Sequence, residues 1–196
     1  MGRGLEGIMD LQKYIRVYKN AVSDSFCDKM IKKFEDNPQQ YRHQKRENVD
    51  RNFKMSFNQI HIMEESGWEK ESDYLMSIFP SYVKKYKEDC DITENQMPLK
   101  YGYEHIRMKR YQPNGEEFFS PHVDVTNHDT ARRFLVFFLY LNNNSAGQTS
   151  FPQLNLGSNC HKGSLLMFPP MWPWLHAGEP PTDKSKYIIG SYLHYV

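Results

Sequence analysis

Residues 133–141 read RFLVFFLYL, one charged side chain followed by eight apolar or aromatic ones. A strand with one face in water would alternate apolar and polar residues, whereas a short continuous apolar run is typical of a strand buried on both faces. The next residues, NNNSAG (142–147), are typical of a turn. The stretch therefore predicts a central strand in a sheet whose two faces are both covered.

Similar short runs, β-branched or aromatic, lie on both sides of this strand. They read YEHIRMKRYQP (103–113), GSLLMFPP (163–170) and KYIIGSYLHYV (186–196). The segments between the runs are rich in residues that favour turns, and read PNG, NNNSAG, LGSNCHKG and PPTDKS. From about residue 100, short strands separated by turn signals predict an all-β sandwich or barrel.

The first half of the chain has helical patterns instead. Residues 23–38 carry apolar side chains at helical spacing, with Ser23 as the N-cap and Pro38 just beyond the end. Residues 72–90 have a second helical pattern. Proline lacks the amide hydrogen that a helix interior needs, so we expect Pro80 to kink this second helix or divide it in two.

Two further segments precede the β region. Residues 14–21 predict a short strand, and the polar residues 39–54 predict a surface loop. No flexible linker separates the two halves. We therefore expect a single domain over residues 1–196, mainly β within the α+β class, with helical support over about 14–99 and a β core over about 100–196.

Charge and composition exclude several classes of protein. The chain has 25 basic and 24 acidic residues, and this balance argues against nucleic acid as a partner. It has no apolar run long enough to span a membrane and no signal-peptide pattern at the N-terminus. The three cysteines show no metal-binding spacing and are expected to be free thiols in a reducing compartment. We expect a soluble, cytoplasmic protein.

A candidate metal site lies in FFSPHVDVTNHD (118–129). Side chains two residues apart in a strand point to the same face, so His122 and Asp124 would converge. An imidazole nitrogen and a carboxylate oxygen held together supply two ligands for a divalent metal, and a third ligand must come from elsewhere. On its own, the pair also fits the hydrogen-bonded polar end of a strand.

Two later residues add to this pattern. His176, in WPWLHAGEPP (172–181), is a candidate third ligand, although it also fits a core histidine among aromatic residues. Two histidines and one carboxylate are typical of non-haem Fe(II) oxygenases. Lys186 begins the last predicted strand, where it is either exposed or paired with the distal carboxylate of a metal-bound 2-oxo acid. His128 and Asp129 are predicted to be loop residues and not metal ligands.

Five blocks of the chain resemble successive motifs of the prolyl 4-hydroxylase-type 2-oxoglutarate, Fe(II)-dependent dioxygenases. In chain order they are YQPNGEEFFSPHVD (111–124), RRFLVFFLYLN (132–142), AGQTSFP (146–152), KGSLLMFPP (162–170) and HAGEPPTDKSKYIIGSYLHYV (176–196). The resemblance covers about residues 100–196. It implies a double-stranded β-helix, or jelly-roll, core with N-terminal supporting helices.

The resemblance also implies roles for individual residues. His122, Asp124 and His176 match the family's iron ligands, and Lys186 matches the residue that pairs with the C5 carboxylate of 2-oxoglutarate. Other residues match positions near the cosubstrate, namely Tyr111, Tyr140 and Thr149.

Three further residues are candidates for substrate contact. Tyr192 and His194 match a Trp-x-His pair near the substrate, and tyrosine in place of tryptophan is a departure from the family pattern. Arg132 is a candidate substrate contact or a cap at the end of the central strand.

The implied activity is hydroxylation of an unactivated C–H bond, most simply that of a prolyl residue in a protein or peptide. The reaction would use Fe(II), O₂ and 2-oxoglutarate, release succinate and CO₂, and have ascorbate as a further cofactor. One alternative is a hydroxylase of a free amino acid or other small molecule. Others are a non-catalytic metal-binding jelly roll and a zinc hydrolase. A nucleic-acid demethylase is disfavoured because Arg133 is the last arginine of the chain, so the C-terminal strand contains none.

Overall fold

A computed structural model of the protein describes residues 10–196. Two α-helices in this range are α1 (Asp24–Glu35) and α2 (Glu69–Asp89). The strands are β1 (Arg16–Tyr18), β2 (Arg42–Asn48), β3 (Phe53–His61), β4 (Tyr101–Tyr103), β5 (Arg107–Tyr111), β6 (Phe119–His122), β7 (Arg133–Tyr140), β8 (Asn144–Phe151), β9 (Leu156–Cys160), β10 (Leu165–Phe168), β11 (His176–Gly178) and β12 (Lys186–Tyr195).

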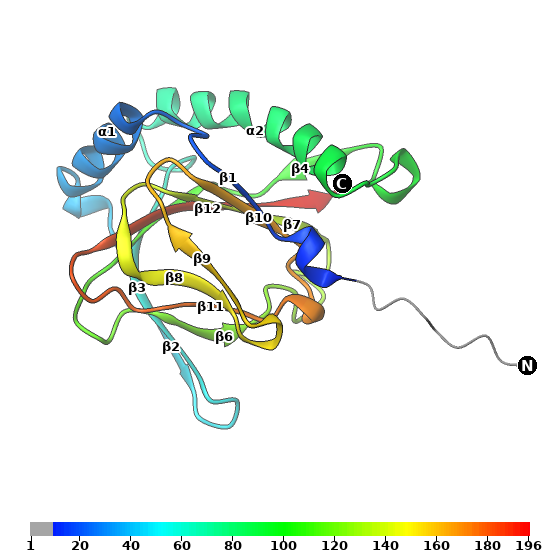
Figure 1. Cartoon of the computed structure of the whole chain (residues 1–196). Helices are drawn as coiled ribbons and strands as arrows, with labels where there is room; N and C mark the ends of the chain where they lie inside the picture. Colours follow the sequence, from blue (N-terminus) through cyan, green and yellow to red (C-terminus); the bar gives the residue numbers. More distant parts are fainter. Residues whose placement is uncertain (1–9) are drawn as a thin grey trace, which may run out of the picture.

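The strands form one antiparallel sheet that curls into a nearly closed, barrel-like jelly roll (Figure 1). Its order is β1-β10-β7-β12-β5-β3-β6-β11-β8-β9, with β2 added to β3 and β4 added to β12. The jelly-roll core with supporting helices, expected from the sequence, is confirmed. None of the helices in residues 10–196 is both long enough and apolar enough to cross a bilayer.

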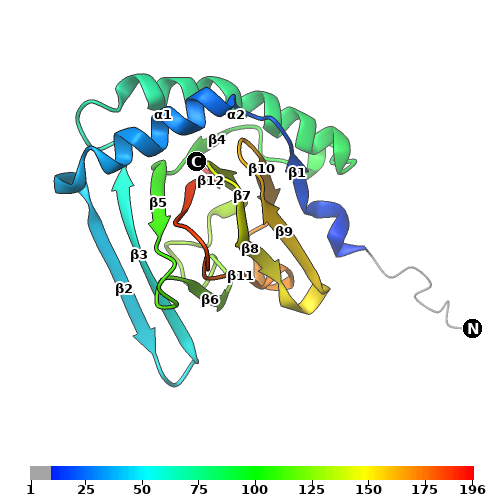
Figure 2. The same ribbon diagram turned by 60° about the vertical axis from the view of Figure 1, so that its left-hand side comes forward.

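The helices cover one outer face of the sheet, on the side of β10, β7 and β12 (Figures 1 and 2). Phe137 and Leu139 of β7 point to this side and join a buried cluster with Phe34 of α1 and Phe79 of α2. The rings of Phe79 and Phe137 stack with centroids 5.0 Å apart. Burial of these large side chains fixes the helical layer against the sheet.

The opposite face of β7 lines the interior of the barrel. Phe138 and Tyr140 point inward and belong to a second buried cluster, which includes Phe168 of β10 and Ile188 of β12. Consecutive residues of β7 therefore supply both cores. This confirms the prediction of a central strand covered on both faces.

Both predicted helices are present. The side-chain oxygen of Ser23 accepts a hydrogen bond from the backbone N–H of Phe26 at 3.2 Å, so Ser23 is the N-cap of α1. The helix ends at Glu35, just before Pro38. Pro80 does not divide α2, which continues through it as one helix, and its ring is exposed to solvent.

The surface loop predicted for residues 39–54 is wrong, because most of this segment is a β-hairpin. β2 pairs with β3 from Arg42 opposite Gln59 to Asn48 opposite Phe53. Most side chains of β2 are exposed, so the strand has no apolar alternation that the sequence could reveal. The hairpin projects from one edge of the barrel (Figure 2).

The N-terminal half is therefore not purely helical support. β1 pairs with β10 and β3 pairs with β5 and β6, so strands from the first half complete the barrel. A second hairpin, formed by β8 and β9, occupies much of the runs NNNSAG and LGSNCHKG, which the sequence predicted as turns. Their small polar residues sit in half-buried strands, where backbone pairing outweighs turn propensity.

Candidate metal centre

Three candidate ligands meet where β6 ends and β11 begins. His122 is the last residue of β6 and His176 the first of β11, and the two are direct partners in the antiparallel register. Asp124 lies two residues beyond the end of β6, and its backbone N–H donates to the carbonyl oxygen of Pro170 at 3.0 Å. Strand pairing thus unites two histidines that are 54 positions apart, and the short step beyond β6 adds the carboxylate.

The three side chains form a compact donor set. The Nε2 atom of His122 lies 3.4 Å from Oδ1 of Asp124, and the Nε2 atom of His176 lies 3.3 Å from Oδ2. One ligand atom from each residue falls within 4.8 Å of the others, close enough to share one metal ion. His128 and Asp129, by contrast, are fully exposed on the following loop, in agreement with their exclusion from the ligand set.

The hydrogen bonds of the imidazole rings favour metal binding. Nδ1 of His122 lies 2.8 Å from the carbonyl oxygen of Ser120, and Nδ1 of His176 lies 3.0 Å from that of Trp174. A carbonyl can only accept, so each Nδ1 carries the proton and each Nε2 keeps a free lone pair. This outer contact also fixes the orientation of each ring.

Two atoms of this set are buried without any hydrogen-bond partner in the described part of the chain. They are Oδ2 of Asp124 and Nε2 of His176. An unsatisfied buried polar atom costs free energy, and a divalent cation between these atoms would remove that cost. The donor set therefore fits iron.

The electrostatics agree with this fit. Burial disfavours the charged form of Asp124, but the neighbouring His176 and His122 outweigh it and hold the pKa of the carboxyl well below its usual range. Burial also lowers the pKa of His122, against the opposing effect of Asp124. A carboxylate and a neutral imidazole are the forms that bind metals.

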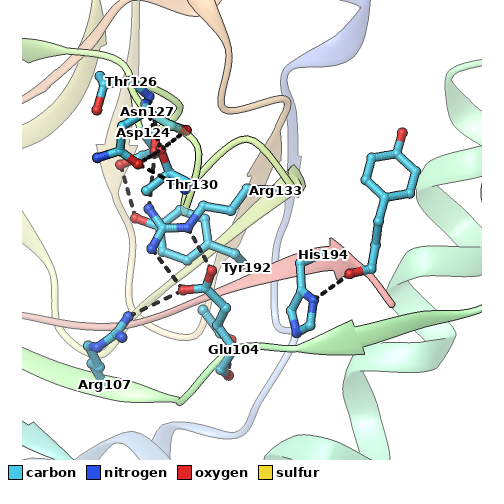
Figure 3. A network of polar contacts seen from close by, with 11 residues as sticks. Glu104, Arg107, Asp124, Thr126, Asn127, Thr130, Arg133, Tyr192 and His194 are labelled. Carbon is cyan, nitrogen blue, oxygen red and sulfur yellow. Dashed lines mark hydrogen bonds and ion pairs between the residues drawn. The ribbon is translucent and has the colours of Figure 1, made fainter.

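A network of polar contacts holds Asp124 in place (Figure 3). The hydroxyl of Tyr192 donates to Oδ1 of Asp124 at 3.0 Å. The guanidinium of Arg133 lies 4.2 Å from the centre of the Tyr192 ring and donates to the backbone oxygen of Asp124 at 3.1 Å. Glu104 accepts two hydrogen bonds from Arg133, at 2.7 and 2.9 Å, which fixes the guanidinium in place.

This network changes the picture drawn from the sequence. Tyr192 was a candidate for substrate contact, and its hydroxyl bonds to Asp124. Arg132 is exposed, whereas Arg133, its neighbour, lines the cleft beside Asp124. Strand alternation would have favoured Arg132, because Arg133 has the parity of Leu135, which faces the helices. The irregular register of β7 against β12 next to Arg133 breaks this alternation.

His194 lies apart from this cluster (Figure 3). Its Nδ1 is 2.9 Å from the carbonyl oxygen of Tyr195, and its Nε2 lies close to Gly102 of β4. The register of β12 against β7 shifts between Leu193 and His194, with Phe134 of β7 as the extra residue. The substrate contact predicted for His194 stays a prediction, and His194 is not among the residues that line the outer cleft.

A narrow inner cavity leads from the donor set to Lys186. It is lined by Tyr111, Thr149, His176 and Lys186, among others. Lys186 is only 1 % exposed, and its Nζ lies 5.1 Å from the centre of the Tyr111 ring. Gly147 allows this placement, because a Cβ atom there would come within 2.9 Å of Cδ of Lys186.

Within residues 10–196, no carboxylate lies within 4.0 Å of the Lys186 ammonium. Burial lowers the pKa of Lys186, with only weak opposition from Cys160 and Glu179. A buried cation is costly unless an anion accompanies it. The cavity thus offers one bound anionic group a partner, at the far end from the metal ligands.

The other cosubstrate candidates differ in their positions. Tyr111 lines the cavity beside Lys186, its direct register partner on β12. Thr149 lines it too, and accepts a hydrogen bond from the hydroxyl of Tyr140 at 2.8 Å. Tyr140 is fully buried behind Thr149, where it positions that hydroxyl.

The donor set also opens outward, into a cleft of about 940 Å³. The cleft lies between the β2–β3 hairpin and the segment that follows β6. Phe119, His122 and Asp124 line both the cleft and the inner cavity. The metal ligands therefore stand where a large outer cleft meets a narrow inner cavity.

Residues 106–194 match the model of the 2OG-Fe(II) oxygenase superfamily, a segment that contains every residue of the donor set and Lys186. Over these residues the chain is similar to this oxygenase superfamily. No curated protein matches its sequence.

Solved structures with a similar fold include prolyl hydroxylases. The viral collagen prolyl hydroxylase of Paramecium bursaria Chlorella virus-1, in a 2-oxoglutarate complex, is 20% identical, with 93% of this chain and 96% of that chain covered and a TM-score of 0.66. A prolyl hydroxylase of Trichoplax adhaerens, in complex with a hypoxia inducible factor peptide fragment, is 15% identical, with 93% and 84% covered and a TM-score of 0.69. A prolyl 4-hydroxylase of Pseudomonas putida is 12% identical, with 93% of both chains covered and a TM-score of 0.60.

At these identities the likeness concerns the fold, the double-stranded β-helix of this oxygenase. The match of residues 106–194 to the superfamily model, together with the donor set, makes the protein a 2-oxoglutarate-dependent dioxygenase whose cofactors are iron and 2-oxoglutarate. His122, Asp124 and His176 can bind the iron.

Proposed function

We propose that this oxygenase hydroxylates a residue, most simply a proline, within a peptide or protein. The observation that carries the proposal is the combination of orphaned ligand atoms on Asp124 and His176 with the unpaired ammonium of Lys186 in one continuous cavity. A metal and an anionic chelate whose far end is a carboxylate would satisfy both at once.

In this assignment His122, Asp124 and His176 hold Fe(II), and Lys186 pairs with the C5 carboxylate of 2-oxoglutarate. The chemistry supplied by the bound iron and cosubstrate is oxidative decarboxylation to succinate and CO₂, coupled to hydroxylation of a C–H bond by O₂. Every other contribution comes from the side chains of this chain.

These side chains orient the reactants and exclude water. Lys186 and Tyr111 set the depth and direction of the cosubstrate in the inner cavity. Tyr192 holds the Asp124 carboxylate in one orientation, so its second oxygen stays directed at the metal position. The ring of Phe119 stacks on His122 at a centroid distance of 3.7 Å and shields that ligand from solvent.

The outer cleft supports a peptide substrate. At about 940 Å³ it is larger than a free amino acid requires and lies directly against the metal ligands. The related Trichoplax adhaerens structure is a complex with a peptide fragment. A proline-containing segment laid in this cleft would present its ring to the metal position.

The deciding experiment is anaerobic titration of the Fe(II)-loaded protein with 2-oxoglutarate, monitored by its visible charge-transfer absorption. We expect a band in the wild type, its loss in His176→Ala, and no change in the exposed control His128→Ala. A folded, iron-loaded wild type without a band would contradict the chelate.

The substrate is tested separately by succinate release. Capped proline-containing peptides should stimulate succinate formation and gain one oxygen atom by mass spectrometry. Stimulation by free amino acids alone would replace the peptide assignment with a small-molecule hydroxylase.

A further inference from the structure

A second lysine points into the inner cavity. Lys109 lies on β5 and faces the barrel interior, as does Tyr111, two residues further along the strand. Its Nζ lies 4.8 Å from the ring centre of Phe57 and 5.9 Å from that of Phe119. Lys109 pairs in register with Ile188 of β12. Ile188 lies two residues from Lys186, in the direction of Tyr192.

Lys109 differs from the other cations of its strand. Arg110 pairs with Glu35 at 2.9 Å, and Arg107 lies 3.9 Å from Glu104. No carboxylate of the described residues lies within 4.0 Å of the Lys109 ammonium. Burial lowers the pKa of Lys109 to about 8, against an ordinary value of 10.5, although Asp124 partly opposes the shift.

The bound cofactors do not account for this charge, given the function proposed above. The two positive charges of Fe(II) and the one of Lys186 balance the single negative charge of Asp124 and the two of 2-oxoglutarate. Arg133 is already paired with Glu104. The ammonium of Lys109 remains the surplus charge in a desolvated site, where an anion would be strongly attracted.

The outer cleft has the same sign of charge. Lys45, Arg46 and Arg51 line it from the β2–β3 hairpin, against one carboxylate of the hairpin, Glu47. None of these three cations has an ion-pair partner within 4.0 Å among residues 10–196. Such a cleft attracts acidic ligands and repels basic ones.

We propose that Lys109 binds a carboxylate of the substrate, and that this substrate is an acidic segment of a peptide or protein. The carboxylate would come from a side chain close to the hydroxylated residue, with the rest of the segment lying along the basic hairpin. Lys109 is then a specificity-determining residue that recognises charge beside the reacting C–H bond. This inference rests on the proposed oxygenase function.

The test uses capped pentapeptides with a central proline and glutamate or glutamine at each flanking position in turn. Their affinity is measured for the anaerobic protein loaded with Fe(II) and 2-oxoglutarate. At one position at least, we expect the glutamate peptide to bind wild type about tenfold more tightly than its glutamine counterpart, as a charge-assisted hydrogen bond requires.

Three variants assign the preference. Lys109→Met keeps the length of the side chain without its charge and should abolish the preference for glutamate, whereas Lys109→Arg should retain it. Lys70→Met removes an exposed charge from α2, on the far side of the sheet, and should behave as wild type. A preference that survives in Lys109→Met would overturn the proposal, as would the absence of any preference.

A second measurement separates Lys109 from the cosubstrate site. Lys109→Met should leave the affinity for 2-oxoglutarate within about twofold of wild type, because both carboxylates of 2-oxoglutarate have partners other than Lys109. A loss of about tenfold or more would assign Lys109 to the cosubstrate instead. A wild type that shows no 2-oxoglutarate band would refute the oxygenase site itself, which is a different result.

The stability of the metal-free protein distinguishes binding from a structural role. Lys109 is half-buried, and removing its unpaired charge relieves part of a desolvation cost, so Lys109→Met should have a higher Tm than wild type. A lower Tm would indicate that Lys109 supports the fold.

The binding test also has an outcome that would refute the peptide part of the proposal. That outcome is a preference for acidic ligands that is seen only when the ligand carries a free α-carboxylate.

Discussion

Single side chains at this site combine a structural cost with a chemical use. Asp124 and His176 leave ligand atoms buried and unsatisfied, and Lys186 holds a charge with no anion beside it within the described chain. Each arrangement destabilises the empty protein slightly and binds its partner more strongly, because the cost has been met before binding. The empty ligand site thus lowers the free energy of unfolding of the protein.

Lys186 should govern the affinity for 2-oxoglutarate. Lys186→Ala removes the cavity's cation next to Tyr111 and should weaken 2-oxoglutarate binding by about a hundredfold, as expected for a buried charge-assisted contact. Fe(II) affinity should stay within about twofold, because no iron ligand is touched. Titrations with each ligand measure both constants, and Lys186→Arg is the charge-retaining control. Equal losses in both titrations would make Lys186 structural.

Tyr192 should position the metal-binding carboxylate. Tyr192→Phe keeps the ring under Arg133 and removes only the hydrogen bond to Oδ1 of Asp124. Fe(II) affinity should fall about tenfold, the usual effect of losing an outer-shell contact to a ligand. Tyr195→Phe, at an exposed position, is the matched control. Unchanged iron affinity in Tyr192→Phe would show that the hydroxyl does not orient Asp124.

At the scale of elements, the pattern of apolar residues decided which strands could be predicted from the sequence. β7 is buried on both sides, so its residues are continuously apolar and the strand could be predicted. β2 is exposed on both sides and β9 reads LGSNC, with small residues between its ends, so neither showed a recognisable pattern. Strands that are held mainly by backbone pairing have no characteristic side-chain pattern from which they could be predicted.

The cap of α1 is an element whose contribution can be measured. Ser23→Ala removes the acceptor for the N–H of Phe26 and should lower the free energy of unfolding by about 1 kcal/mol. Denaturant titration followed by circular dichroism gives the value. Ser81→Ala, on the exposed side of α2, should change stability by less than about 0.5 kcal/mol. A similar small change for Ser23→Ala would mean that water replaces the cap.

At the scale of the whole molecule, the barrel separates two environments. The face towards α1 and α2 is an apolar core that holds the sheet, whereas the interior holds cations, histidines and a carboxylate among aromatic rings. Buried charges in the interior make stability depend on pH and on bound ligands.

The metal-free protein should gain stability relative to Lys109→Met as the pH rises from about 8 towards about 10. Folding lowers the pKa of Lys109 from 10.5 to about 8, so in this window the unfolded chain binds more protons and loses more on alkalinisation. Burial raises the pKa values of Cys27 and Cys160 to about 11, which opposes this gain in both proteins, so the effect of Lys109 is the difference between them. Urea denaturation across this range measures it, and Lys109→Met should show a smaller rise.

The sequence by itself determined the covered central strand, the pairing of His122 with Asp124, and the candidates His176 and Lys186. The strand and the pair depend on local periodicity, and His176 and Lys186 on motifs that resemble a known family, and a linear chain records both directly. Only the tertiary structure decided that the β2–β3 hairpin borders the cleft, that Arg133 and not Arg132 supports Asp124, and that Lys109 turns into the cavity. Strand register and the side each residue faces follow from contacts between segments far apart in the chain, and no local pattern encodes them.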